Sequence, residues 1–251
     1  MHQTNDTALQ VITSGAFAAA LQELTPVYCQ QHKEAIELHF GSSLGAAHDS
    51  IPTRLSQGQC FDAFILARKA LDEFATLGHL AAGKGWDLVE SNIGMAVRID
   101  EQAPDISTLA SFREALLKAP SVALAASASG IYLSTEVFAL LGIAERMHKT
   151  AFTVYSERVG HVVARGEAAI GFQQVSEIMP IKTVKLVGLL PIEIRKPFYF
   201  SAAVGAQCTQ PQRLTRVKRF LQFLASPQAQ DMIRKTGLDP LFPEIEMAQS
   251  L

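Results

Sequence analysis

The sequence predicts an α/β fold with two lobes, each a mixed sheet flanked by helices. Apolar runs of strand length alternate with helical patterns from the beginning of the chain. A polar segment interrupts this alternation near residue 100, and a second alternation begins after it. The length of 251 residues also suits two lobes, because domains usually have about 100 to 150 residues.

The first part of the chain contains three pairs of a strand and a helix. Apolar runs at 9–13, 36–40 and 63–66 each precede a helical pattern that starts near residue 16, 45 or 68. Repeated units of this kind predict mostly parallel strands connected by helices. The run 63–66 has no polar alternation, so we expect it to be buried on both faces.

A second group of elements follows the polar segment 100–107, DEQAPDIS, which we expect to cross between the lobes. The expected helices are 107–118, 130–141 and 158–165, and the expected strands are 122–125, 169–172, 183–190 and 198–204. Two helices close the chain, and Ser226 and Pro227 mark the start of the last one. The first lobe is therefore expected to comprise 1–97 and 201–251, and the second lobe 98–200.

The composition favours no electrostatic partner. Lys and Arg number 22 against 24 for Asp and Glu, so no global field attracts nucleic acid or an anionic membrane. Three cysteines and seven dispersed histidines lack the spacing of a metal or redox site, so we expect no metal and no cofactor. No apolar stretch approaches the roughly 20 residues of a membrane-spanning helix, and we expect the chain as given to be soluble.

Small hydroxyl residues and glycines gather at four expected junctions between a strand and a helix. These are 13-TSGAF-17, 41-GSSLG-45, 127-SASGIY-132 and 155-YSER-158. Ligands of open α/β sheets lie beyond the carboxyl ends of the strands, where helix starts present unpaired N–H groups to anions. The junctions together would suit an anion, although each serine or threonine could equally be a helix cap. None of them matches a P-loop or a dinucleotide fingerprint.

Several motifs appear in a characteristic order along nearly the whole chain. They are 11-VITSGAFAAALQEL-24, 39-HFGSSLGAAHDSI-51, 129-SGIYLSTEVFALLGI-143, 166-GEAAIGF-172 and 223-FLASPQAQDMIRKTGL-238. In this order they resemble the bacterial molybdate-binding protein family, within the type II periplasmic solute-binding proteins. The resemblance implies a type II periplasmic-binding-protein fold, in which two lobes joined by crossing strands close on a ligand. It also implies a periplasmic monomer that works with the membrane component of an ABC transporter. A signal peptide is then expected to be absent from the sequence as given, and a cytoplasmic location is the alternative.

The resemblance also implies where the ligand binds. Carried over by position, the ligand-binding residues are Ser14, Gly15, Ser42, Ser43, Ser129, Gly130, Ser156 and Gln174. Gln174 stands where the family often has a tyrosine, and Ala16 falls near the place of the family's first binding serine.

A second departure concerns Arg68. The family usually has a Ser-Ala-Asp pattern after the third strand, whereas this chain has Leu66, Ala67 and Arg68. Neutral donors suffice for a tetrahedral oxyanion, but a carboxylate fits the guanidinium fork. We therefore predict a small organic di- or tricarboxylate as the ligand, with Arg68 and Arg158 among its binding residues. The alternatives are an ion pair of Arg68 on the lobe surface and a cleft for molybdate or tungstate.

Two classes of function remain open. In the first, the protein is a receptor that hands an organic anion to a transporter. In the second, the resemblance extends to the aconitate-isomerase-like branch of the same family, which implies a cofactor-independent isomerase that interconverts cis- and trans-aconitate by moving a proton across the allylic system. Glu157, His48 and Tyr155 are candidates for the group that moves the proton, and the sequence does not decide among them. The absence of a G-x-S-x-G elbow disfavours a hydrolase.

Overall fold

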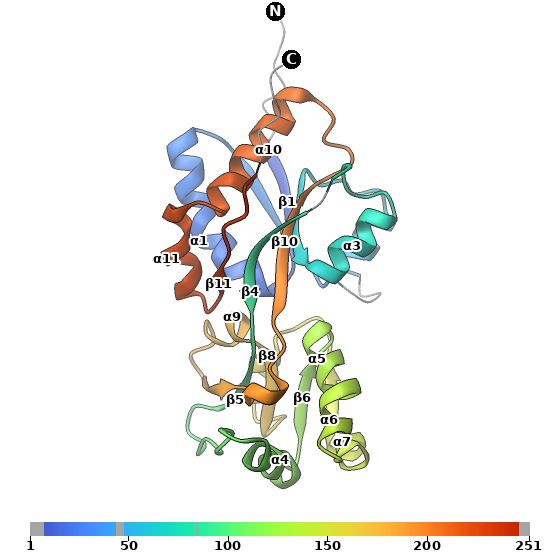
Figure 1. The fold of residues 1–251 in the computed structure, drawn as a ribbon, viewed down its shortest axis with the longest axis vertical. Coiled ribbons are helices and arrows are strands. Elements are labelled where there is room, and N and C mark those ends of the chain that lie inside the picture. The colour runs from blue at the N-terminus through green and yellow to red at the C-terminus, as the bar shows by residue number, and fades with distance from the viewer. Residues whose placement is uncertain (1–7, 44–47, 84, 246–251) are drawn as a thin grey trace, which may run out of the picture.

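The computed structural model describes residues 8–43, 48–83 and 85–245 of the chain. Within these residues two sheets, each flanked by helices, follow one another along the long axis of the molecule (Figure 1). The strand order is β11-β4-β10-β3-β1-β2 in the first sheet and β7-β6-β8-β5-β9 in the second. Both sheets combine parallel and antiparallel pairs, so the predicted two-lobed α/β fold with mixed sheets is confirmed.

The first lobe is built on parallel strands to which antiparallel strands are added. β1 pairs in parallel with β2 and β3, and β10 lies antiparallel between β3 and β4. The strands are β1 (Leu9–Thr13), β2 (Ile36–Phe40), β3 (Ala63–Ala67), β4 (Trp86–Ser91), β10 (Phe198–Val204) and β11 (Asp239–Pro240). The helices are α1 (Gly15–His32), α2 (Ile51–Ser56), α3 (Arg68–Thr76), α10 (Pro211–Leu224) and α11 (Pro227–Lys235).

Side-chain alternation along β1 explains why helices cover both faces of this sheet. Leu9 and Val11 pack in the cluster that contains the apolar faces of α1 and α10. Ile12 points to the other face and packs in the cluster that contains Leu71 and Phe74 of α3. Each such buried side chain stabilises the lobe by about 1.5–3 kcal/mol. This packing fixes the carboxyl end of β1 at the point where α1 begins.

The second lobe repeats the arrangement on a smaller scale. Its strands are β5 (Ile93–Arg98), β6 (Val122–Ala125), β7 (Ala151–Val154), β8 (Ile170–Gln174) and β9 (Val184–Leu189). Its helices are α4 (Leu109–Lys118), α5 (Ala128–Tyr132), η1 (Leu133–Val137, one π turn), α6 (Phe138–Leu140), α7 (Ala144–Thr150), α8 (Val159–Ala164), α9 (Val175–Ile178) and the 3₁₀ turn η2 (Ile192–Ile194). The core contains Phe112 and Phe172, whose rings meet edge to face with centroids 5.9 Å apart.

The chain changes from the first sheet to the second at Asn92. β4 ends at Ser91 in the first sheet, and β5 begins at Ile93 in the second. The segment 100–107, expected to cross between the lobes, instead leads from β5 into α4, and the expected lobe boundary at residue 97 falls inside β5. The extended pattern over 88–99 hides the crossing, because strands of two different sheets lie in it with one residue between them.

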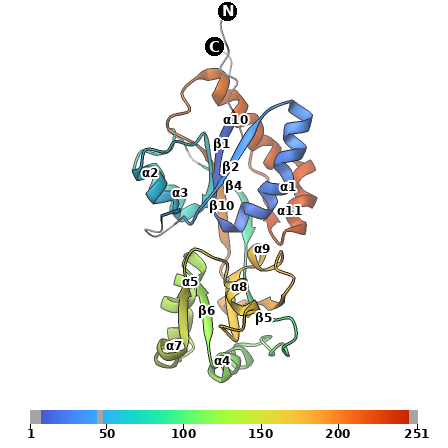
Figure 2. The ribbon, with the colours of Figure 1, turned by 180° about the vertical axis from the view of Figure 1, so that it is seen from behind.

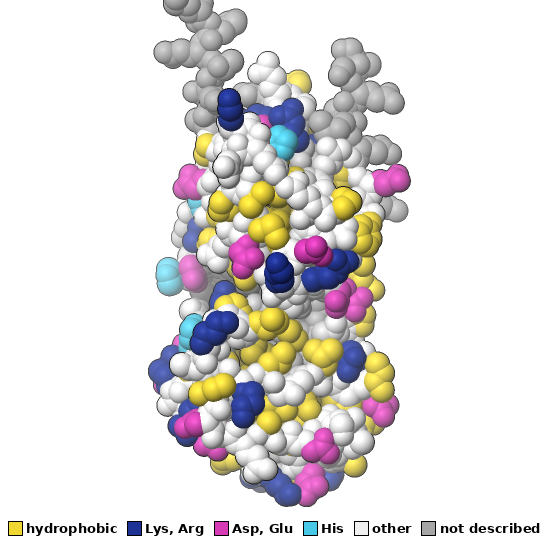
Figure 3. Space-filling view, turned by 90° about the vertical axis from the view of Figure 1, so that its left-hand side faces the viewer, with side chains coloured by type: hydrophobic (Ala, Val, Ile, Leu, Met, Phe, Trp, Pro, Cys, Tyr) yellow, Lys and Arg dark blue, Asp and Glu magenta, His cyan; other side chains and the backbone are white. Residues whose placement is uncertain are grey.

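The two lobes touch along α9. Figures 1 and 2 place α9 next to the lower end of α1, and the two helices are in contact. Acidic and basic side chains intermingle over both lobes on the side of the molecule shown in Figure 3. This agrees with the balanced composition. No described helix has both the length and the apolar character needed to cross a membrane.

Candidate functional site

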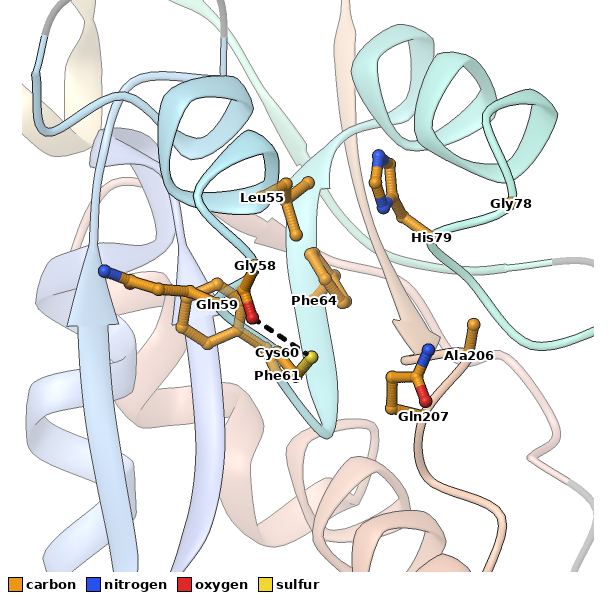
Figure 4. A pocket seen from close by; sticks show the side chains of 10 residues that line it. All are labelled: Leu55, Gly58, Gln59, Cys60, Phe61, Phe64, Gly78, His79, Ala206 and Gln207. Atoms are coloured by element: carbon orange, nitrogen blue, oxygen red, sulfur yellow. Dashed lines mark hydrogen bonds between the residues drawn. The ribbon is translucent and has the colours of Figure 1, made fainter.

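A pocket of about 230 Å³ in the first lobe has none of the predicted binding residues in its lining (Figure 4). Its lining includes Leu55, Phe61, Phe64 and His79. Phe61 precedes β3, so the pocket lies at the amino end of that parallel strand. Ligands of open α/β sheets bind beyond the carboxyl ends of the strands. The predicted site therefore lies at the opposite edge of the sheet.

The start of α1 is one half of that site. Thr13 ends β1, and its buried hydroxyl donates to the Ile65 carbonyl of β3 at 2.8 Å. Ser14 precedes the helix with an extended backbone, and its side chain makes no capping hydrogen bond. The first turn of α1 contains no acidic residue. Its N–H groups and the positive end of the helix dipole are thus suited to an anion.

Glu177 of α9 faces this helix start from the second lobe. A Cβ atom added to Gly15 would collide with the Glu177 carboxylate, so the missing side chain at Gly15 is what lets the carboxylate lie against the start of α1. Burial raises the pKa of Glu177 from its ordinary 4.5 to about 7. The positive charge of Arg158 and a hydrogen bond from Gln173 act in the opposite direction. Glu177 can therefore exchange a proton near neutral pH.

Gln173 connects Glu177 to the start of α8. Its side-chain nitrogen donates to Glu177 Oε1 at 3.0 Å, and its side-chain oxygen accepts from the Val159 N–H at 2.9 Å. This second bond caps α8 in place of Arg158, which occupies the N-cap position but makes no capping bond itself. Both hydrogen bonds fix the orientation of the amide. We call Gly15, Arg158, Gln173 and Glu177 the interlobe cluster.

Two predicted residues lie at the start of α5, at the carboxyl end of β6. The hydroxyls of Ser127 and Ser129 are 3.0 Å apart, and Ser129 is buried. A Cβ atom at Gly130 would collide with the Ala125 carbonyl, so close packing of the helix on the end of β6 requires a residue without a side chain. Figure 1 shows that α5 begins on the side of the second lobe that faces the first.

Three further predicted residues lie at strand ends that face the other lobe. The buried Gln174 accepts a hydrogen bond from the Ser91 hydroxyl at 2.8 Å, which ties the end of β8 to the crossing between the sheets. Ser42 and Ser43 follow β2 and are partly buried, and the Ser42 carbonyl accepts from the Ile51 N–H at 2.9 Å. The 41–45 junction runs on into 44–47, which lies outside the described residues.

The three groups suggested as proton carriers are all exposed. Both carboxylate oxygens of Glu157 accept from Arg165 at 2.9 Å, and these bonds lower the pKa of Glu157. Glu157 is therefore held in its ionised form, which makes it a weak base. Tyr155 is 71% exposed, and His48 lies in an exposed turn. Ser156, between Tyr155 and Glu157, has a left-handed backbone with φ of 59°.

Arg68 has partners in its own lobe. Its Nε donates to Asp87 at 2.8 Å, and its Nη2 donates to Asp87 and to the Gly85 carbonyl. The register pairs Asp87 with Ser201 and Ser201 with Leu66, so Asp87 lies two strands across the sheet from the last part of β3. This is the ion pair on the lobe surface that the sequence left open. A carboxylate ligand would have to compete with Asp87 for the same guanidinium.

Sequence reasoning missed Glu177 and Gln173. Glu177 lies in the first turn of a helix, where an acidic residue ordinarily complements the helix dipole, so the residue itself gave no signal. The one available hint is that Glu177 follows the predicted binding residue Gln174 by three residues, so both lie within one helical turn of each other at the start of α9. Within the described residues, no group of three or more His, Cys, Asp or Glu side chains could hold a metal ion.

Residues 9–239 match a family described as bacterial extracellular solute-binding protein. The chain is 35% identical over 235 residues to an aconitate isomerase from Pseudomonas sp, covering 94% of this chain and 88% of that protein. Among solved structures it is similar to the periplasmic molybdate-binding protein of Azotobacter vinelandii, with a TM-score of 0.72 and 18% identity over 94% of this chain and 100% of the other. It is also similar to Peb3 from Campylobacter jejuni, with a TM-score of 0.67 and 12% identity over 92% and 99%. These two structures share the fold.

Proposed function

Because this chain belongs to the bacterial extracellular solute-binding proteins, we propose that it binds a small organic polycarboxylate between its lobes and interconverts cis- and trans-aconitate there. The observation that carries the proposal is the 35% identity to an aconitate isomerase, which extends over both lobes and their connections. The start of α1 and the charge of Arg158 support it, since both suit a carboxylate.

The reaction asks for little beyond positioning and a proton carrier. A base removes a proton from the methylene carbon of aconitate next to a carboxylate, and a proton returns at the other end of the allylic system. Charge that spreads into the substrate carboxylates is stabilised by the N–H groups at the start of α1 and by Arg158. All of these groups belong to the chain itself, so the proposed reaction requires no cofactor.

A receptor for the same class of acid is the second candidate function. Solute-binding proteins of ABC transporters bind small ligands and interact with membrane components, and this chain belongs to such a family. In that case the protein would deliver the acid to a transporter from the periplasm, as a monomer. Molybdate or tungstate is the third candidate, and the similarity to molybdate-binding proteins supports it only through the shared fold.

The test is to incubate the purified protein with cis-aconitate and follow the ligand by proton NMR. Heat-inactivated protein is the control for spontaneous isomerisation. Catalytic formation of trans-aconitate supports the isomerase. Broadened ligand signals without conversion support the receptor instead, and binding of molybdate without any response to carboxylates would refute both.

A further inference from the structure

Among the described residues of the candidate site, Glu177 of the interlobe cluster is a carboxyl group whose position and protonation suit proton transfer. We propose that Glu177 is the catalytic residue that carries the proton during the allylic shift, with Gln173 as its positioning residue. The proposal rests on the proposed isomerase function and names a group that the sequence did not single out.

The position of Glu177 brings it next to a bound carboxylate. The first N–H groups of a helix have no partner within the helix, and Ser14 does not cap those of α1 with its side chain. A substrate carboxylate that accepts hydrogen bonds from these N–H groups lies beside Gly15. Glu177 already contacts Gly15, so its oxygens are adjacent to the carbon atoms that the bound carboxylate carries. The two lobes thus supply the anion site and the proton carrier from opposite sides.

The pKa of Glu177 suits a group that accepts and returns a proton near neutral pH. A general base works best when its pKa lies near the operating pH, and burial raises the pKa of Glu177 to about 7. Arg158 is the charged group that acts on it, and it prevents a higher value. The other titratable groups on the elements in contact with α9 are Glu23, Tyr28, Cys29 and His32 of α1, Arg98 of β5, His161 of α8 and Lys185 of β9. Of these elements, α1 places no acidic residue in its first turn, where Glu177 makes its contact.

Gln173 restricts the carboxyl group to one orientation. Its amide nitrogen donates to Glu177 Oε1, the carboxylate oxygen that lies nearest to Gly15, and the backbone of Gln174 also hydrogen-bonds to the carboxylate. The amide cannot rotate freely, because its oxygen accepts from the Val159 N–H. A positioned base gains most of its advantage from such a fixed approach.

The chemistry then balances with a single group. The ionised Glu177 takes a proton from the methylene carbon, so that a C–H bond breaks, an O–H bond forms and the electron pair enters the allylic system. Glu177 then returns the proton to the carbon at the other end of that system, and the double bond is left between the former methylene carbon and the central carbon. No proton is gained or lost overall, and Glu177 ends in its starting form.

The experiment compares the wild type with Glu177→Gln, Glu177→Asp and the matched control Glu167→Gln. Glu167 is an exposed glutamate of the second lobe that pairs with Arg165. We expect Glu177→Gln to lower kcat by about 100-fold or more, as for loss of a general base, while cis-aconitate still binds by calorimetry. Glu177→Asp should retain part of the activity and move the midpoint of the kcat/KM profile below that of the wild type. Glu167→Gln should change neither.

The outcomes separate this assignment from the proposed function. If the wild type converts cis-aconitate and Glu177→Gln converts it within threefold of the same rate, Glu177 is not the proton carrier although the isomerase stands. An unchanged pH profile in Glu177→Asp overturns the assignment in the same way. If the wild type itself converts no aconitate, the proposed function fails and this assignment fails with it. Melting curves of each variant show that a loss of activity is not a loss of folding.

Discussion

Replacing Glu177 by glutamine should make the protein more stable at neutral and alkaline pH. The pKa of Glu177 is 4.5 in an exposed setting and about 7 in the fold, and each tenfold change in a protonation equilibrium equals about 1.4 kcal/mol. Below pH 4.5 both the folded and the unfolded chain carry the proton, and stability is unaffected. Between pH 4.5 and about 7 the unfolded chain releases it first, so the folded state loses stability as the pH rises.

The stability that the folded protein loses when Glu177 ionises sets the size of the gain expected for Glu177→Gln. Above pH 7 it amounts to roughly 3 kcal/mol at most, and glutamine avoids it because it stays neutral while its oxygen can still accept from Gln173. We therefore expect Glu177→Gln to gain roughly 1 to 3 kcal/mol near pH 8, seen as a rise in Tm of about 2 to 10 °C. Near pH 4 the gain should vanish.

Thermal melting followed by circular dichroism at both pH values measures the effect. The control is Glu167→Gln, which should act with the opposite sign: Arg165 lowers the pKa of Glu167, so its removal should destabilise the protein near pH 8 and matter less as the pH falls. A gain for Glu177→Gln that is equal at both pH values, or no gain near pH 8, would show that the carboxyl is not a buried group with a raised pKa.

Three further predictions concern Gly15, Arg158 and Arg68. Gly15→Ala should displace the carboxyl of Glu177, because the added Cβ meets the flexible end of that side chain. We expect kcat to fall at least tenfold with little change in Tm. An unchanged kcat would mean that the contact has no part in catalysis. Arg158→Gln removes the charge that lowers the pKa of Glu177, so the midpoint of the kcat/KM profile should move to higher pH, and a shift to lower pH would contradict the assigned charge effect. Arg68→Ala should lower the free energy of unfolding by about 1 kcal/mol, because the ion pair with Asp87 is lost. The Kd for cis-aconitate, measured by calorimetry, should change less than threefold. A tenfold or larger loss of affinity would place Arg68 at the ligand.

The fold could be predicted from the sequence because its strands are short apolar runs with clear helical patterns between them. The run 63–66 is buried on both faces as predicted, and the strands at 9–13 and 36–40 begin and end where their apolar residues do. The crossing between the sheets could not be predicted. A strand that continues straight into a second sheet has the same alternation on both sides of Asn92, and the side chains alone do not show which neighbours each half will pair with.

The candidate site was predicted less well, for a physical reason. Helix starts with serine and glycine can be found from local sequence, and Ser14, Gly15, Ser129 and Gly130 do lie at such starts. The property that distinguishes Glu177 is its pKa, which depends on burial against a glycine more than 160 positions away in the chain. Similarly, the partner that Arg68 has in this structure is Asp87, and β10 lies between their two strands. Long-range pairing decides both cases, and local patterns do not encode it.

The carboxyl of Glu177 also distinguishes an enzyme from a receptor on this fold. A receptor for a polyanion gains nothing from an acid beside the anion site, because the ionised form repels the ligand by about 1 kcal/mol or more at close range. An isomerase requires such a group, and accepts the repulsion because the same charge removes the proton. Glu177→Gln should therefore bind cis-aconitate at least about fivefold more tightly near pH 8 while it loses turnover, as measured by calorimetry and NMR on the same sample. Weaker binding would mean that the protonated carboxyl holds the ligand as a hydrogen-bond donor, and Glu177 would then fit a receptor as well as an isomerase.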